Sequence, residues 1–169
     1  KSEYVLYVAR LFKLREANIE FIRETESKTP DLKIEDSLYV ECKKAADLDS
    51  FNNTKQLGRK IESNFRKAKS QIPKGAPGLV CLDLPQNINL LNLTIVESIY
   101  NELRGELQKE NGSIGCVTTW SNIMEDDKGE ARELKSTHRL FISSAIDSVS
   151  FSILKQAKVV EVFGQPYTP

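Results

Sequence analysis

The chain has 169 residues, of which 40% are hydrophobic and 28% charged, and its formal net charge is zero. This length suits one well-buried core, and no run reaches the ~18 apolar residues that a membrane-spanning helix needs. The first residues also lack the order of a secretory signal peptide, so we expect a cytoplasmic protein with no membrane partner. From this length and composition we expect residues 1–169 to form a single domain. The chain begins with Lys1 rather than Met, so a longer protein could contain this domain.

The first part of the chain is predicted to form a helix, a short strand and a hairpin. Apolar residues at helical spacing predict a helix over residues 3–15, and residues 19–23 are a short strand candidate. Pro30 has no amide hydrogen to donate and interrupts the pattern. Extended segments at 31–34 and 38–43 flank a turn-prone Glu-Asp-Ser sequence, which together predict a β-hairpin.

The rest of the chain alternates helical and extended patterns. The predicted segments are helices over 54–71 and 90–109 and strands over 78–85, 114–120 and 138–143. The tail from Val149 onward is weakly patterned, and we expect its last five residues to fray. This order of elements predicts an α/β fold, a three-layer sandwich with a mixed central β-sheet flanked by helices.

The cysteines and the single histidine exclude several kinds of site. Cys42, Cys81 and Cys116 lie far apart in apolar, strand-like runs, which argues against disulfides and against a zinc cluster. We expect them to be buried free thiols. His138 is the only histidine, so a site with two histidines is excluded.

The hydrophobic pattern of the hairpin selects one pairing register. Side chains on a strand alternate between faces, so the apolar residues of both strands share one face only in a particular alignment. In that alignment Ile34 lies opposite Leu38 and Leu32 lies opposite Val40, across a three-residue loop.

The same register predicts a carboxylate pair on the other face. It places Asp31 opposite Glu41 at roughly 5 Å, which destabilises a sheet unless a cation lies between the two charges. Two carboxylates, the backbone carbonyl of Cys42 and water are ligands that Mg²⁺ or Mn²⁺ accepts. Lys43 reaches the same face, and a metal beside an ammonium can activate water for phosphodiester hydrolysis. The alternative is an ordinary solvated strand face.

Pro30-Asp31, nine intervening residues and Glu41-Cys42-Lys43 resemble the motif of the PD-(D/E)XK nuclease superfamily. The context is similar over residues 1–85: a helix before the motif, a hairpin that carries it, a polar helix and then a hydrophobic strand. The resemblance implies a restriction-endonuclease-like fold in which Asp31 and Glu41 ligate the metal. It also implies that Lys43 positions or activates the attacking water.

The resemblance suggests further site residues from two helices. Members often add an acidic residue from the first helix, and Glu3 fits, although a glutamate in a first helical turn also stabilises the helix dipole. Some relatives use a polar residue from the second helix, for which Gln71, Lys67 and Gln56 are candidates.

Basic and aromatic residues predict contact with nucleic acid, with DNA as the expected substrate. Lys55, Arg59 and Lys67 belong to a basic segment that could bind phosphates as a group, although each alone is more simply part of a solvated helix face. Tyr4, Tyr7 and Trp120 could stack on bases, whereas Trp120 is better explained by core packing. A homodimer is possible, since cutting both strands of a duplex needs two sites or two events.

The sequence leaves two other classes of function open. One is a nucleic-acid-binding or regulatory domain that keeps the nuclease fold without turnover. The other is a protein-interaction module, for which the only basis is the acidic segment at 125–133.

Overall fold

The computed structural model describes residues 2–23, 29–44, 54–84, 93–109, 114–125 and 128–167, with the side chains of 54, 93, 114, 122–125 and 131–135 also outside the description. Within these residues the elements are α1 (Glu3–Lys13), β1 (Ile19–Phe21), β2 (Leu32–Ile34), β3 (Leu38–Lys44), α2 (Thr54–Lys69), β4 (Gly78–Asp83), α3 (Leu93–Leu107), β5 (Ile114–Glu125), β6 (Ala131–Ile142), α4 (Ser148–Gln156) and α5 (Val159–Phe163). The expected helix start at 90 and strand end at 85 fall outside the described residues.

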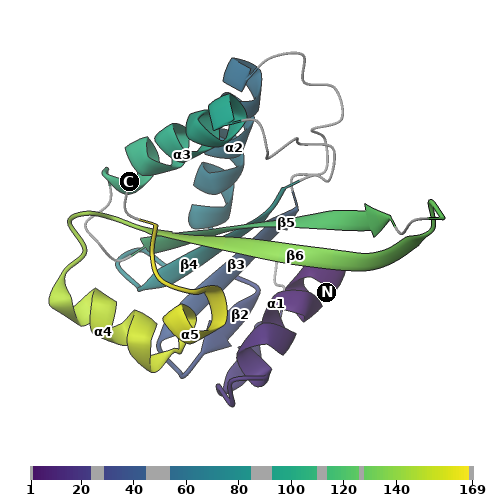
Figure 1. Cartoon of the computed structure of the whole chain (residues 1–169). Helices are drawn as coiled ribbons and strands as arrows, with labels where there is room; N and C mark the ends of the chain where they lie inside the picture. The colour runs from purple at the N-terminus through teal and green to yellow at the C-terminus, as the bar shows by residue number, and fades with distance from the viewer. Residues whose placement is uncertain are drawn as a thin grey trace.

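The strands form one mixed sheet of six strands, in the order β1-β2-β3-β4-β5-β6. The pairs β1–β2, β2–β3 and β5–β6 are antiparallel, while β3–β4 and β4–β5 are parallel. Parallel neighbours need a crossover connection, and α2 and α3 provide the two crossovers. Figure 1 shows α2 and α3 on one face of the sheet and α1, α4 and α5 on the other. The predicted α/β class with a mixed central sheet flanked by helices is therefore confirmed.

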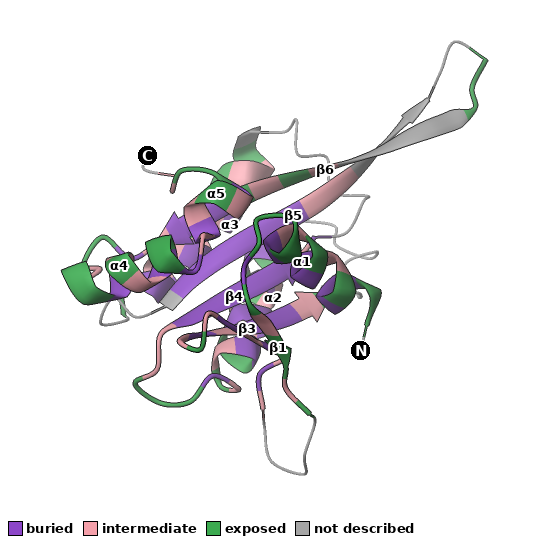
Figure 2. Ribbon diagram, turned by 90° about the horizontal axis from the view of Figure 1, so that it is seen from below, coloured by how far each residue is buried: buried purple, intermediate pink, exposed green. Residues whose placement is uncertain are grey.

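Two hydrophobic clusters, one on each face, hold the helices to the sheet. On the face covered by α1, Leu38 and Val40 of β3 belong to the same cluster as Phe12. On the face covered by α2 and α3, Val80 and Leu82 of β4 belong to a second cluster with residues of those two helices. The central strands are therefore buried on both sides, as the purple ribbon of Figure 2 shows. Complete burial of such a side chain contributes about 1.5–3 kcal/mol relative to leaving it exposed.

The hairpin has the predicted register. The recorded pairs include Leu32 with Val40 and Ile34 with Leu38. Glu35 and Asp36 in the turn have positive φ angles of 49° and 55°. Two consecutive left-handed residues match the right-handed twist of the flanking strands, so this turn fixes the alignment of β2 and β3.

The last two strands are longer than predicted. The apolar runs predicted strands over 114–120 and 138–143, whereas β5 and β6 each have 12 residues. The extra length includes polar pairs, such as Ser121 with Ser136, whose hydroxyls form a 3.0 Å hydrogen bond. A two-stranded extension of this kind has little apolar patterning from which a strand could be predicted.

The weakly patterned tail forms two helices, α4 and α5, that the sequence did not predict. Asp147 caps α4, because its Oδ1 accepts a hydrogen bond from the Ser150 amide at 2.7 Å. The helical path breaks at Lys158, whose φ is 58°, and α5 follows directly. Leu154 and Phe163 are buried against the α1 cluster, so the apolar residues of the tail are divided between two short helices.

The final segment is also more ordered than expected. The Tyr167 amide donates a hydrogen bond to the Leu140 carbonyl of β6 at 2.7 Å, and the Tyr167 ring lies against Tyr100 and Phe141. The expectation of a frayed end is therefore wrong up to Tyr167, and residues 168–169 lie outside the described part. In the described segments no helix combines the length and the apolar character needed to cross a bilayer.

Candidate functional site

Asp31 contacts β3 through its side chain. Its Oδ2 accepts a hydrogen bond from the Cys42 amide at 3.0 Å, and its own amide donates to the Val40 carbonyl at 3.0 Å. The ladder between β2 and β3 ends at Leu32 with Val40, so Asp31 is not the ladder partner of Glu41 that the register predicts. The Asp31 amide bonds to Val40, so the pairing is out of register at Asp31. The Asp31 carboxylate lies at the peptide group that joins Glu41 to Cys42.

Glu41 is buried and held by Gln71. The residue is only 4% exposed, and alternation along β3 directs its side chain toward the α2 face of the sheet. Gln71 Nε2, just beyond the end of α2, donates a 2.6 Å hydrogen bond to Glu41 Oε1. Burying a carboxylate is costly unless it receives hydrogen bonds, so this contact stabilises Glu41 in place. Gln71, one of the three polar candidates predicted from the second helix, therefore contacts Glu41.

Lys43 and Cys42 face opposite sides of β3. Lys43 is half-buried and shares the face of Glu41 by alternation. The Cys42 thiol points into the α1 cluster, where a hydrogen bond with Cys81 and then burial raise its pKa well above the ordinary value. The thiol therefore lies on the sheet face opposite Glu41, away from the predicted metal site. The backbone carbonyl of Cys42 stays the predicted third ligand.

Glu3 does not join these carboxylates. It is the first residue of α1, after the N-cap Ser2, and its side chain is exposed. Helix α1 covers the sheet face that carries Val40 and Cys42, whereas Glu41 points to the opposite face. The sequence predicts a helical Glu3 correctly but not the side of the sheet on which the helix lies.

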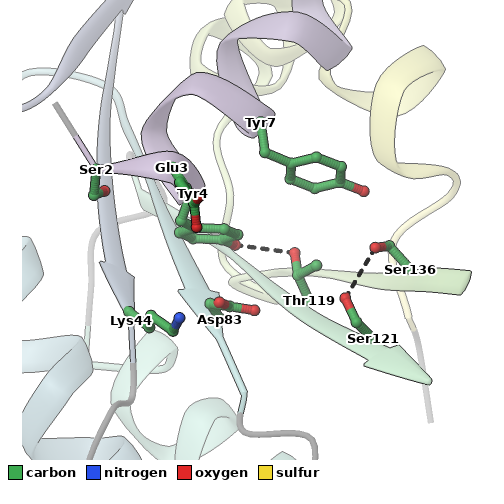
Figure 3. Close-up of a pocket in the computed structure, with 9 residues that line it drawn as sticks. All are labelled: Ser2, Glu3, Tyr4, Tyr7, Lys44, Asp83, Thr119, Ser121 and Ser136. Carbon is green, nitrogen blue, oxygen red and sulfur yellow. Dashed lines mark hydrogen bonds between the residues drawn. The ribbon is translucent and has the colours of Figure 1, made fainter. Parts of the chain in front are cut away.

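Glu3 instead lines a cavity at the carboxyl ends of β3 and β4, which we call the strand-end cavity (Figure 3). Its volume is about 380 Å³, and among the described residues its charged side chains are those of Glu3, Lys44 and Asp83. Burial raises the pKa of Asp83, and the nearby Lys44 charge opposes that shift. Ligands of open α/β sheets commonly bind at the carboxyl ends of parallel strands. Sequence reasoning missed Lys44 and Asp83, although Asp83 ends the apolar run of a central strand.

The basic residues of α2 divide into two groups. Lys55, Arg59 and Lys67, the predicted phosphate contacts, are all exposed. Arg66 has a different role, because its Nε lies 2.7 Å from Glu106 Oε2 of α3. The Arg66 hydrogen bonds, with a further contribution from Lys109, lower the pKa of Glu106 to about 2. Arg66 therefore ties α2 to α3 rather than presenting a charge to a ligand.

The aromatic residues are also divided between the core and the cavity. Trp120 is half-buried against the α2 and α3 cluster, as core packing predicts. Tyr4 and Tyr7 line the strand-end cavity, with ring centroids 6.3 Å apart and ring planes 20° from parallel. The two tyrosines are therefore placed to contact a ligand in this cavity.

A metal ion at the predicted site would have few side-chain ligands. Among the residues that the structure describes, no three or more His, Cys, Asp or Glu side chains are grouped to hold a metal ion. A cation at Asp31 and Glu41 would therefore need backbone oxygen and water as its other ligands. Comparisons with protein-family models, curated proteins and solved structures gave no significant match. Function is therefore inferred from site geometry and the motif resemblance.

Proposed function

We propose that this chain is a metal-dependent nuclease that hydrolyses phosphodiester bonds in nucleic acid, with DNA as the expected substrate. The observation that carries the proposal is the contact between Asp31 Oδ2 and the Cys42 amide. It brings the carboxylate of the first half of the motif to the backbone between Glu41 and Lys43, the second half. The two motif halves are separated in sequence but adjacent in the fold, as a shared site requires.

Two further observations support the proposal. Gln71 lies just beyond the end of α2, the helix after the motif, and contacts Glu41, close to where the resemblance suggests a polar residue. The chain also has the order of elements that the resemblance implies: α1, the β2–β3 hairpin, α2 and then the apolar strand β4. A restriction-endonuclease-like fold belongs to this proposal, and so does a cytoplasmic location.

The donor set fits a hard divalent cation such as Mg²⁺ or Mn²⁺. Asp31, Glu41 and the Cys42 carbonyl would hold it through oxygen, the ligand atom that such ions prefer. When bound, the cation would lower the pKa of a water molecule and polarise the phosphate. Lys43 would orient the attacking water and offset negative charge on the phosphoryl oxygens. Gln71 would fix the Glu41 carboxylate in one orientation through its 2.6 Å hydrogen bond.

A second candidate is a nucleic-acid-binding or regulatory domain without turnover. The burial of Glu41, at 4% exposure, favours it, because a carboxylate so enclosed can serve packing and hydrogen bonding alone. In that case Asp31 would act as an acceptor for the Cys42 amide and as nothing more. The two candidates make different predictions for a variant that keeps the Asp31 hydrogen bond but removes its charge. Only the nuclease would lose activity in such a variant.

The test is cleavage of labelled single-stranded DNA, duplex DNA and RNA in Mg²⁺ or Mn²⁺. Asp31→Asn and Glu41→Gln keep an oxygen acceptor at each position but remove the negative charge. We expect both variants to lose at least about 100-fold in rate, in line with the loss of a group that stabilises a transition state.

The matched control is Asp36→Asn in the turn of the same hairpin. Asp36 is exposed and has a φ of 55°, a conformation that asparagine adopts readily. This variant should cleave at the wild-type rate. Cleavage that survives Asp31→Asn and Glu41→Gln would overturn the proposed site, and intact nucleic-acid binding with no cleavage in either metal would support the second candidate.

A further inference from the structure

The strand-end cavity lies on the opposite side of the sheet from Glu41. Lys44, the last residue of β3, and Asp83, the last residue of β4, form its floor, and the first turn of α1 forms its rim (Figure 3). Its volume of about 380 Å³ is near the lower end of the range of roughly 300–1,000 Å³ typical of small-molecule sites. It is therefore of a size to enclose one small ligand.

The aromatic wall of the cavity is fixed before any ligand enters. The Tyr4 hydroxyl donates a 3.0 Å hydrogen bond to Thr119 Oγ1, and the Tyr7 hydroxyl lies 2.9 Å from His138 Nε2. The two rings are nearly parallel. Aromatic rings held in this way can contact a planar ligand without losing further side-chain freedom.

The charged side chains of the cavity are the groups that can form hydrogen bonds with a ligand. The hydroxyls of Ser121 and Ser136 are hydrogen-bonded to each other. Within the part of the chain that the structure describes, the side chains of Glu3, Lys44 and Asp83 make no hydrogen bond or ion pair, although the Lys44 charge lies near Asp83, its partner in the β3–β4 ladder. Two carboxylates offer only acceptors, and one ammonium offers only donors. A complementary ligand thus has N–H groups for the carboxylates and an anionic or carbonyl oxygen for Lys44.

We propose that the strand-end cavity binds a single unpaired nucleobase that carries an exocyclic amine, such as adenine or cytosine, from a nucleic-acid strand. The carboxylates of Asp83 and Glu3 accept hydrogen bonds from the amine, as acidic side chains do from cytosine N4. Tyr7 contacts the base plane, and Lys44 binds the adjoining phosphate. Thymine and uracil have no exocyclic amine. They place a carbonyl oxygen at that position, and it is repelled by the carboxylates because both groups are acceptors.

This inference rests on the proposed function, because it names the class of strand that the nuclease-type site would act on. A base within a duplex uses its amine for pairing, so a cavity that reads the amine needs a single-stranded or unpaired substrate. Asp83 ends β4 and lines the cavity, whereas Asp31 directly precedes β2 and does not line it, so the two sites can be altered separately.

The test is fluorescence anisotropy of short oligo-dA, oligo-dC and oligo-dT with the full chain, in EDTA to prevent cleavage. The wild type should bind oligo-dA and oligo-dC about 10-fold more tightly than oligo-dT, which corresponds to ~1.4 kcal/mol. Asp83→Asn should remove this preference, because an amide offers both a donor and an acceptor. Glu3→Gln, at an exposed position, should reduce it, and Lys44→Met should weaken all three complexes alike.

The control is Glu20→Gln, at an exposed position of β1, which should keep the wild-type preference. Equal binding of the three oligonucleotides by the wild type, or a preference that survives Asp83→Asn, would overturn the inference. Deoxycytidine monophosphate that binds as tightly as oligo-dC would overturn it too, by assigning the cavity to a free nucleotide.

The two proposals fail in different ways. A wild type that cleaves DNA but binds the three oligonucleotides alike would overturn this inference alone. A wild type that prefers oligo-dC and oligo-dA but never cleaves would overturn the proposed function alone. Asp31→Asn should keep the base preference, because Asp31 does not line the cavity.

Discussion

Asp31 Oδ2 accepts a hydrogen bond from the Cys42 amide at 3.0 Å, across the end of the β2–β3 ladder. The carboxylate thus takes a place that a backbone carbonyl would hold in a continued ladder, and its negative charge lies at the peptide group that joins Glu41 to Cys42. Structure and chemistry therefore make different demands on the same side chain. An acceptor oxygen is enough for the hydrogen bond, but metal binding also needs the charge.

Substitution of Asp31 should separate these two roles. Asp31→Asn keeps an acceptor oxygen and should leave the free energy of unfolding within about 0.5 kcal/mol of the wild type. Asp31→Ala leaves the Cys42 amide without this acceptor and should cost about 1–3 kcal/mol. Urea unfolding measures both. Equal loss of stability in the two variants would show that the charge itself, and not the hydrogen bond, holds the hairpin.

Gln71 should matter for the stability of Glu41. Gln71→Ala removes the 2.6 Å hydrogen bond to a buried carboxylate and should lower the free energy of unfolding by about 1–3 kcal/mol. Gln108→Ala, at an exposed position after α3, is the matched control and should change it by less than about 0.5 kcal/mol. If the two variants unfold at the same urea concentration, Gln71 does not support Glu41 as described.

Nucleic-acid binding should depend on the exposed cations of α2. Replacing Lys55, Arg59 and Lys67 together by glutamine should weaken binding to every sequence alike and reduce the slope of log K against log salt by about 2. The matched control replaces Arg10, Lys13 and Arg15, which are exposed in the last turn of α1 and just beyond it. A slope that is unchanged by the α2 substitutions, or reduced equally by the control, would place the phosphate contacts elsewhere.

The link between α2 and α3 should be sensitive to acid. The Arg66 hydrogen bonds lower the pKa of Glu106 from 4.5 to about 2. A lowered carboxyl pKa stabilises the folded state above the ordinary pKa, and this contribution is lost as the pH falls through the folded value. The free energy of unfolding, measured with urea, should therefore fall more between pH 4.5 and 2 for the wild type than for Glu106→Gln. Parallel curves for the two proteins would contradict the assignment.

The hairpin could be predicted because one physical requirement selects its register. Burial of Leu32 and Val40 on one face leaves a single alignment of two short strands, and the structure has it. The pattern could not show that the ladder ends before Asp31. The ladder ends there because the Asp31 carboxylate, and not a backbone carbonyl, accepts the hydrogen bond from the Cys42 amide. The alternation of apolar residues carries no information about this contact.

The placement of Glu3 and the strand-end cavity could not be predicted in the same way. An amphipathic pattern shows that α1 buries one stripe, but the sheet face that receives this stripe is set by tertiary packing. Lys44 and Asp83 meet only because parallel strands end at the same edge of the sheet, which requires knowledge of the strand order. Each residue alone looks like an ordinary polar strand end.

The central claim is that Asp31 and Glu41 bind one cation, and a crystal soaked in Mn²⁺ tests it most directly by anomalous scattering. The proposed site predicts a single strong peak within about 2.0–2.6 Å of an oxygen of Asp31 and an oxygen of Glu41. The same peak should be missing from an Asp31→Asn crystal. Mn²⁺ bound only elsewhere, for example between Glu3 and Asp83, or no bound Mn²⁺ at millimolar concentration, would contradict it.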